Sequence, residues 1–404
     1  MKEKVVLAYS GGLDTSVIVH WLNSKGFSVI AVCFDVGQKV DDWQRVINTA
    51  KTSGAAEALV VDIKHEFVDN FFLPCLQMNA LYEGSYLLGT AMARPLIAQK
   101  QIEIANSKGA KYVSHGATGK GNDQARFEMS YLILNPNIKI IAPWKMAEFY
   151  QNYPGRKELL DYAAKHDIKV KVTKEQPWSS DENLMHISFE AGLLEDPNKK
   201  PPPEMFEMTK SPQDAPNKGT VITIDFVKGV PVKLNGKDLN LVEMLTKLNQ
   251  LGGDNGVGRV DLVESRFIGM KSRGVYETPG GTILMQAHRQ IESITLTRDV
   301  IELKDSLLSR FSDLVYNGYW FTPQMSLLLD LVKNSQKSVN GQVRLEIYKG
   351  NVITLGRSSK TSLYDFDIAS MEKNQSNYNP EDANGFIKLN ALPYIIKNLN
   401  QPQD

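Results

Sequence analysis

The strongest constraint on the fold lies near the N-terminus, where a short apolar run leads into a glycine-rich turn. Residues 5 to 7 are apolar, the sequence AYSGGLDTS follows at residues 8 to 16, and apolar residues then recur at helical spacing up to residue 22. This order predicts a β-strand, a tight turn and an α-helix. Small residues and hydroxyls let backbone N–H groups converge on an anion at a helix N-terminus, so we expect a phosphate-binding loop.

The loop is not of the Walker A type, which needs a Lys followed by Ser or Thr. Here Asp14 stands in the loop, and no Lys follows Gly11 and Gly12. The Ser-Gly-Gly-x-Asp pattern resembles the loop of the ATP pyrophosphatases, which cut ATP between its α- and β-phosphates. That resemblance implies adenylation rather than γ-phosphoryl transfer. The residues alone also allow an ordinary strand-to-helix turn in which Asp14 only adds a favourable charge to the first helical turn.

A second polar loop follows another predicted strand, near residues 111 to 114. Its sequence, SHGATGKGNDQAR at residues 114 to 126, combines glycines, hydroxyls, amides and charges, which make a poor core and a good pocket wall. It is not a P-loop, because Gly121 follows Lys120 and Ser114 stands where a glycine is needed. The chain also lacks a complete Gly-x-Gly-x-x-Gly fingerprint, so dinucleotide binding is disfavoured.

The first part of the chain alternates between strand and helix patterns. Strands are predicted near residues 4–9, 28–34, 58–62, 111–114 and 138–141, with helices near 13–25 and 41–53 between the first three. This alternation is typical of an α/β fold with a doubly wound parallel sheet. Ligands of such sheets bind at the carboxyl ends of the strands, so we expect one cleft to contain both polar loops.

After Pro177 the pattern changes to that of an α+β domain. A proline-rich stretch at residues 196–203 is interpreted as a loop or linker, with a polyproline ligand as the less favoured alternative. Beyond it we expect a strand at 221–226, a hairpin through Asn235-Gly236, helices near 279–295, 298–316 and 323–336, a strand pair at 342–356 and a final helix at 389–399. The predicted domains are an ATP-binding domain at 1–168, a substrate-binding domain at 169–370 and a C-terminal tail with its helix at 371–404.

Charge and composition indicate small-molecule partners. The 404 residues carry 46 Lys plus Arg and 46 Asp plus Glu, so no global field favours nucleic acid or an anionic membrane. We expect a cytoplasmic protein, because residues 1–12 lack a signal-peptide pattern and no apolar run is long enough to span a membrane. Cys33 and Cys75 form no Cys-x-x-Cys pair, and the six histidines are not paired at helical spacing, so we expect no metal-ligating residues.

Six motifs, in order along the chain, resemble those of the argininosuccinate synthase family. They are AYSGGLDTS, YLLGTAMARP at 86–95, SHGATGKGNDQARFE at 114–128, APW at 142–144, PWSSDENLMHIS at 177–188 and ESRFIGMKSRGVYETPGGT at 264–282. The resemblance extends from about residue 5 to about residue 390. It implies ATP-dependent ligation of citrulline and aspartate to argininosuccinate, through a citrullyl-adenylate, with release of AMP and pyrophosphate, as a step of arginine biosynthesis and the urea cycle. It also implies Mg²⁺ and a homotetramer, in which the C-terminal helix reaches a neighbouring subunit; the sequence alone equally allows that helix to dock on its own core.

The same resemblance implies a role for individual residues. ATP would be held by Ala8, Tyr9, Ser10, Gly11, Gly12, Leu13, Asp14, Thr15, Ser16, Phe34 and Gly116. Citrulline would be held by Tyr86, Thr90, Asn122, Arg126, Ser179, Ser188, Glu264 and Tyr276. Aspartate would be held by Thr118, Asn122 and Asp123, and Asp14, Lys120 and Asp123 would carry the catalytic roles. One Arg would then serve a citrulline carboxylate and one Glu its ammonium.

Several points remain open at this level. Ala91 departs from family members that have Ser there, so that contact to citrulline is absent or supplied by Thr90. Glu264 lies in an alternating, strand-like run in which an exposed acid is ordinary. The general base for the aspartate amine is not identified. The alternative functions are another adenylating ligase with the same loop and a catalytically silent nucleotide-binding sensor.

Overall fold

A computed structural model describes residues 2–119, 121–169, 177–372 and 378–401. Contacts divide the chain into two compact units, Met1–Thr361 and Ser362–Asp404. The predicted catalytic residue Lys120 lies outside the described residues. The predicted boundary at residue 168 adjoins the undescribed residues 170–176, so this division into domains stays a prediction.

The N-terminal part contains the predicted parallel sheet. Its strand order is β3-β2-β1-β4-β5, and every neighbouring pair is parallel. The strands are β1 (Lys4–Ala8), β2 (Ser28–Asp35), β3 (Glu57–Asp62), β4 (Tyr112–Ser114) and β5 (Lys139–Ile141). The order runs outward in one direction from β1 to β3 and in the other from β4 to β5. The strand order therefore reverses between β1 and β4, and the doubly wound fold is confirmed.

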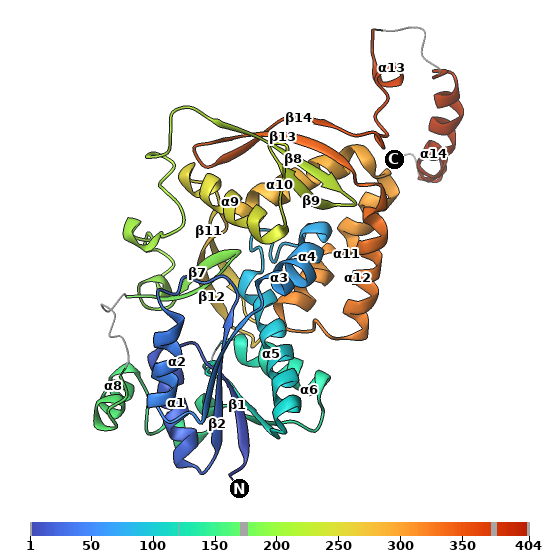
Figure 1. The fold of residues 1–404 in the computed structure, drawn as a ribbon. Coiled ribbons are helices and arrows are strands. Elements are labelled where there is room, and N and C mark those ends of the chain that lie inside the picture. The colour runs from blue at the N-terminus through green and yellow to red at the C-terminus, as the bar shows by residue number, and fades with distance from the viewer. Residues whose placement is uncertain (1, 120, 170–176, 373–377, 402–404) are drawn as a thin grey trace. The chain divides into compact units, whose positions relative to one another are not determined.

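Helices cover both faces of this sheet because successive side chains of β1 point to opposite faces. Val5 and Leu7 pack in one cluster with α1, α7 and α8, whereas Val6 packs in the main core with α5. Figure 1 shows α1 and α2 on one side of β1 and β2, with α5 and α6 on the other. The helices of this part are α1 (Leu13–Ser24), α2 (Trp43–Thr52), α3 (Lys64–Phe67), α4 (Leu73–Met78), α5 (Gly89–Lys108), α6 (Asp123–Leu134), α7 (Ala147–Tyr150) and α8 (Arg156–Lys165), with a π-helical turn η1 (Val68–Phe72) and a 3₁₀ turn η2 (Pro143–Lys145).

Two antiparallel sheets follow in the same compact unit. The four-stranded sheet has the order β11-β12-β7-β6, and the five-stranded sheet has the order β10-β9-β8-β13-β14. The strands are β6 (Ser179–Asn183), β7 (His186–Glu190), β8 (Thr220–Val227), β9 (Val230–Leu234), β10 (Lys237–Asp238), β11 (Arg259–Ser265), β12 (Lys271–Glu277), β13 (Gly341–Tyr348) and β14 (Asn351–Ser358). The predicted hairpin through Asn235-Gly236 joins β9 to β10, and both residues have positive φ, as a tight hairpin turn requires.

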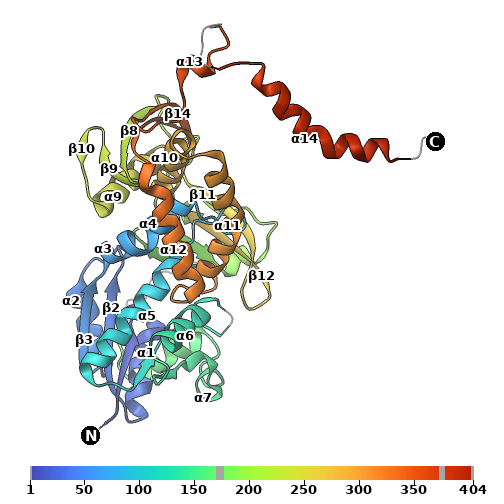
Figure 2. The same ribbon diagram turned by 90° about the vertical axis from the view of Figure 1, so that its right-hand side faces the viewer.

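Four long helices complete this unit, which Figure 2 shows from the side. They are α9 (Leu241–Asp254), α10 (Pro279–Thr295), α11 (Arg298–Tyr316) and α12 (Pro323–Ser335), with 3₁₀ turns η3 (Gly192–Glu195), η4 (Pro203–Met205) and η5 (Gln336–Ser338). One apolar core joins α5 and η1 of the first part to α9, α10, α11 and β13 of the second. The parallel sheet and the second part are therefore held together by a shared core.

The second unit consists of α13 (Phe366–Ala369) and α14 (Asp382–Leu399). The final helix was predicted to begin near residue 389, but it begins at Asp382, and Pro393 lies inside it. The polar residues near its start supply an acidic first turn, which favours a helix N-terminus. Large apolar side chains of α14 are exposed, among them Phe386 and Tyr394. In the described part of the chain, no helix has the length and apolarity needed to cross a membrane.

Candidate active site

The candidate active site lies where the strand order of the parallel sheet reverses. One polar loop follows β1 and leads into α1, and the other follows β4 and leads into α6. In doubly wound sheets this reversal opens a crevice at the carboxyl ends of the strands. The loops approach so closely that a Cβ on Gly116 would lie 3.0 Å from Cγ2 of Thr15.

The glycine turn after β1 is braced by its own hydroxyls. Gly11 has φ +81°, in the left-handed region that favours glycine. Oγ of Ser10 lies 3.0 Å from Oγ1 of Thr15. The hydroxyl of Ser16 is fully buried, where it donates to the carbonyl of Gly12 over 2.8 Å and contacts the hydroxyl of Tyr9 over 2.9 Å. Ser16 therefore shapes the turn from inside, whereas Ser10 and Thr15 line the neighbouring cavity.

This turn forms one wall of a cavity of about 510 Å³, a size suited to a small ligand. Of the residues predicted to bind ATP, those that line it are Ala8, Tyr9, Ser10, Asp14, Thr15, Phe34 and Gly116. The others, Gly11, Gly12, Leu13 and Ser16, belong to the turn but do not line this cavity in the described part of the chain, and the Leu13 side chain packs in the core. Burial raises the pKa of Asp14, and the charge of Arg156 opposes that rise.

A second cavity, of about 280 Å³, adjoins the first and collects most residues predicted to bind citrulline and aspartate. Those residues are Tyr86, Thr90, Thr118, Asn122, Asp123, Arg126, Ser188, Glu264 and Tyr276. The two cavities share Arg94, Gly116, Ala117, Asp123, Ser180 and Asp181 as walls. The two cavities are therefore neighbours, separated by these residues.

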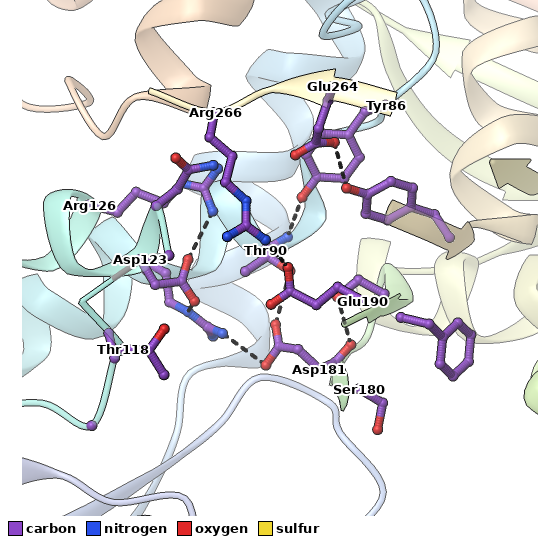
Figure 3. A pocket seen from close by; sticks show the side chains of 18 residues that line it. Tyr86, Thr90, Thr118, Asp123, Arg126, Ser180, Asp181, Glu190, Glu264 and Arg266 are labelled. Atoms are coloured by element: carbon purple, nitrogen blue, oxygen red, sulfur yellow. Dashed lines mark hydrogen bonds and ion pairs between the residues drawn. The ribbon is translucent and has the colours of Figure 1, made fainter. Parts of the chain in front are cut away.

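A chain of ion pairs crosses the shared wall, as Figure 3 shows. Nε of Arg94 lies 2.8 Å from Oδ2 of Asp123, and its Nη2 lies 2.8 Å from Oδ1 of Asp181. Nη1 of Arg126 lies 2.8 Å from Oδ1 of Asp123. The sequence predicted one arginine, Arg126, in this site. The structure has two, because Arg94 and Arg126 both form ion pairs with Asp123.

Asp123 is thus held by two guanidinium groups. Burial alone would raise the pKa of its carboxyl, but the charges and hydrogen bonds of Arg94 and Arg126 outweigh burial and hold the pKa below its usual value. The group is an ionised anchor at the start of α6. Its predicted contact to aspartate can use only the lone pairs that the two arginines leave available.

Glu264 is buried rather than exposed, against the expectation from its alternating strand. Its Oε2 accepts a hydrogen bond from the hydroxyl of Tyr276 over 2.6 Å, and its Oε1 accepts one from the hydroxyl of Tyr316 over 2.5 Å. The rings of Tyr276 and Tyr86 are stacked, with centroids 4.4 Å apart. Burial raises the pKa of both stacked tyrosines, so they stay neutral and form an uncharged wall beside the carboxylate.

Asn122 and Arg126 have structural contacts that sequence reasoning did not foresee. Nδ2 of Asn122 donates to the hydroxyl of Tyr316 over 2.8 Å, and its Oδ1 accepts from the backbone N–H of Phe267 over 3.0 Å. Nε of Arg126 donates to the carbonyl of Tyr316 over 2.7 Å. Both residues line the cavity, but each also ties α6 to the end of α11.

The hydroxyl of Thr90 is engaged by two neighbours. Its Oγ1 lies 2.9 Å from Oδ2 of Asp181 and 2.9 Å from Nε2 of His186. Burial lowers the pKa of His186 to about 4, so its ring is neutral. Thr90 has one proton, and donating it to the Asp181 carboxylate leaves a lone pair to accept from Nε2–H of His186. Thr90 therefore has no free donor to replace the hydroxyl missing at Ala91.

The strand β6 presents Ser180, rather than the predicted Ser179, to both cavities. Ser180 and Asp181 line the walls, and Ser179 does not in the described part of the chain. Across the ladder from Asp181, Ser188 lines the second cavity and its hydroxyl contacts the Asp181 carbonyl over 3.4 Å.

Among the described residues, four charged residues that line the second cavity were not predicted: Arg94, Asp181, Glu190 and Arg266. Arg94, Asp181 and Arg266 stand inside the motifs at 86–95, 177–188 and 264–282, so motif membership was an available signal for them. Glu190 lies just after the fifth motif and is 2.5 Å from Nη2 of Arg266. Their convergence could not be read from the sequence because they come from α5, β6, β7 and the turn after β11.

The described residues contain no group of three or more His, Cys, Asp or Glu side chains placed to hold a metal ion. Asp14, beside the hydroxyls of Ser10 and Thr15, is the kind of oxygen donor that suits Mg²⁺ carried on nucleotide phosphates. The first cavity thus fits a metal ion that is held mainly by the phosphates of a substrate.

Comparisons with known proteins match the whole length of the chain. A model described as Arginosuccinate synthase N-terminal HUP domain matches residues 4–169, and one described as Arginosuccinate synthase C-terminal domain matches residues 178–397. Proteins named argininosuccinate synthase are similar to it: one from Thermotoga sp. (strain RQ2) is 53% identical over 99% of this chain and 98% of its own, and one from Homo sapiens is 50% identical over 97% and 96%. A relative of the same name from Danio rerio is 51% identical over 97% of this chain and 95% of its own. With both domains matched around a site built from the same motifs, the chain belongs to the argininosuccinate synthase family.

Proposed function

We propose that this enzyme ligates L-citrulline and L-aspartate to argininosuccinate, converting ATP to AMP and pyrophosphate, as a step of arginine biosynthesis and the urea cycle. The observation that carries the proposal is the pair of adjoining cavities, one walled by the glycine turn and the other by Glu264, Arg126 and the stacked tyrosines. Their shared wall is where a nucleotide α-phosphate and a ureido oxygen could meet. Membership of the family supports the same reaction.

In this proposal the chemistry begins with activation of citrulline. Its ureido carbon is a poor electrophile, because the nitrogen lone pairs delocalise into the carbonyl. Attack of the ureido oxygen on the α-phosphorus forms a P–O bond, breaks the bond to the β-phosphate and releases pyrophosphate. The resulting citrullyl-adenylate carries AMP as a leaving group, which the aspartate amine then displaces. The protein mainly positions the reactants and stabilises charge.

We place the pyrophosphate end of ATP at the turn after β1. Backbone N–H groups at the start of α1 favour an anion there, and the hydroxyls of Ser10 and Thr15 face the cavity. Asp14 would hold Mg²⁺, which neutralises charge on the phosphates when bound. Lys120 would contact the leaving pyrophosphate. Phe34 would pack against the adenine.

We place citrulline against Glu264 and Arg126, with its ammonium near Glu264 and its carboxylate near the arginines. Tyr86, Tyr276 and Ser188 would complete its pocket, and the structure favours Ser180 over Ser179 as the β6 contact. Thr118, Asn122 and Asp123 would hold aspartate. This arrangement puts both amino acids in the second cavity, which shares Asp123 with the first.

We further propose that the enzyme works as a cytoplasmic homotetramer. The exposed apolar side chains of α14, including Phe386 and Tyr394, support a role for this helix in assembly. Sedimentation of the full chain tests the assembly. A monomer at micromolar concentration would contradict it.

Exchange of labelled pyrophosphate into ATP tests the proposed reaction. The adenylation step predicts exchange that requires citrulline but not aspartate. A silent nucleotide sensor predicts none, and a ligase for another substrate predicts exchange only with that substrate. Absence of exchange with citrulline would therefore reject the proposal.

A further inference from the structure

Two carboxylates occupy the wall between the nucleotide cavity and the amino-acid cavity. Among the described residues, Asp123 and Asp181 are the acidic residues that line both cavities. The proposed reaction needs a proton acceptor at this junction, because aspartate arrives with a protonated amine and only the free amine has a lone pair for attack. Among the described carboxylates that line both cavities, the choice lies between these two groups.

Their surroundings separate them. Asp123 is gripped by Arg94 and Arg126, each 2.8 Å away, and is therefore a poor acceptor for a proton. Asp181 contacts one guanidinium, Nη2 of Arg94, and one neutral hydroxyl, that of Thr90. About a third of its side chain, 35%, is exposed, compared with 26% for Asp123.

Besides Arg94, the charged groups near Asp181 include two carboxylates, one of which, Glu190, is itself paired with Arg266. Glu182 on β6 and Glu190 on β7 both interact electrostatically with Asp181, and that interaction contributes to raising the pKa of each, after the larger effect of burial. Arg94 is the cation that contacts it directly. A proton that arrives at Asp181 reduces the repulsion among these three carboxylates.

The carboxylate is also held in a fixed orientation. Thr90 donates to its Oδ2, and Thr90 is in turn held by the buried, neutral ring of His186. Gly89 makes room for this ring, since a Cβ there would lie 2.6 Å from it. Such a supporting layer is what keeps a catalytic group in position.

We propose that Asp181 is the general base that accepts a proton from the ammonium group of the aspartate substrate. This inference rests on the proposed function. The ammonium gives one proton to the Asp181 carboxylate, and the freed lone pair forms the C–N bond to the ureido carbon. The bond from that carbon to the AMP oxygen breaks, and its electron pair leaves with AMP. The second proton lost by the attacking nitrogen leaves with the AMP phosphate.

The test separates the two half-reactions in the full-length enzyme. Asp181→Asn keeps the size of the side chain and an oxygen for Arg94, but it cannot take up the proton. Citrulline-dependent pyrophosphate exchange should persist within about threefold, whereas argininosuccinate formation should fall roughly 10²- to 10⁴-fold, the usual worth of a general base. Asp261→Asn is the matched control. Asp261 is another Arg-bound aspartate of the same sheet, it does not line either cavity, and its loss should change neither half-reaction.

A pH profile distinguishes a base from a structural residue. Ligation by Asp181→Asn should rise about tenfold per pH unit between pH 7 and pH 8.5, because the amine of free aspartate, unlike a peptide N-terminus, titrates above this range, and its unprotonated fraction rises by that factor well below the pKa. Ligation by the wild type should be nearly flat over this range. Asp181→Glu, which restores a carboxylate one methylene further along, should recover part of the rate.

The outcomes are distinguishable. Loss of exchange and ligation to the same extent in Asp181→Asn, or a ligation rate close to wild type, would overturn the assignment of Asp181. A variant ligation rate without pH dependence would overturn it as well. Absence of exchange in the wild type would instead reject the proposed function.

Discussion

The hydroxyl of Tyr276 donates a 2.6 Å hydrogen bond to Glu264 inside the protein. The two residues lie on neighbouring antiparallel strands, β12 and β11, and the second oxygen of Glu264 is taken by Tyr316 from α11. An acid that alternation alone would leave exposed is therefore buried, with neutral donors on both oxygens. A buried carboxylate held in this way suits a ligand cation.

Glu264→Gln should weaken citrulline binding about 10- to 100-fold, which corresponds to about 1.5–3 kcal/mol for a lost charge-assisted contact. The amide also leaves one tyrosine hydroxyl without an acceptor. Calorimetric titration with citrulline measures the effect, and ATP affinity should stay within about twofold. Glu302→Gln, which breaks an exposed pair with Arg298, is the control. Unchanged citrulline affinity in Glu264→Gln would remove Glu264 from the citrulline site.

Asp14→Asn should reduce pyrophosphate exchange roughly 10²- to 10³-fold without unfolding the protein. Burial raises the folded-state pKa of Asp14 above its unfolded value. Ionisation of Asp14 therefore lowers the free energy of unfolding as the pH rises from the unfolded-state pKa through the folded-state pKa. The Asn variant lacks this cost and should unfold at the same temperature as the wild type or at a higher one near pH 7. Thermal unfolding and exchange are measured on the same preparation. Normal exchange would leave Asp14 as a favourable charge at the start of α1.

Arg126→Lys should weaken citrulline more than ATP and also lower the free energy of unfolding. Lys cannot contact both the carbonyl of Tyr316 and the carboxylate of Asp123, as Nε and Nη1 of Arg126 do. We expect a loss of about 1–3 kcal/mol in urea unfolding. Equal weakening of citrulline and ATP would assign Arg126 a structural role only.

His186→Gln should change how the free energy of unfolding depends on pH. Burial lowers the folded-state pKa of His186 from 6.5 to about 4, so below pH 6.5 the unfolded chain binds the proton more readily than the folded one. The wild type therefore loses roughly 2 kcal/mol from this group between pH 7 and pH 5. Gln keeps a donor for Thr90 but does not titrate. The free energy of unfolding of the variant should therefore rise relative to that of the wild type as the pH falls. A constant difference in urea unfolding across this range would contradict a neutral, buried His186.

The sequence predicted the scaffold of this site better than its charges. The alternation of strands and helices that predicts the parallel sheet is a local sequence pattern. Both polar loops follow strands of this sheet, so their convergence after β1 and β4 could be expected. The ion pairs that Arg94 makes with Asp123 and Asp181 could not be expected. The two aspartates lie on α6 and β6, which follow only after the chain has crossed the sheet. The burial of Glu264 could not be predicted for a related reason: Tyr316, which helps to bury it, lies 52 residues away on a helix. The choice of Ser180 over Ser179 depended on where β6 begins, at Ser179, and the sequence of a short polar strand does not reveal this boundary.

The most direct test of the account uses citrulline labelled with ¹⁸O in its ureido oxygen. If that oxygen attacks the α-phosphorus and AMP later leaves with it, the label must appear in the phosphate of AMP, with one AMP formed for each argininosuccinate. Mass spectrometry of the nucleotide product reads this out. Unlabelled AMP, or ADP as the product, would contradict the adenylation mechanism on which the assignment of both cavities depends.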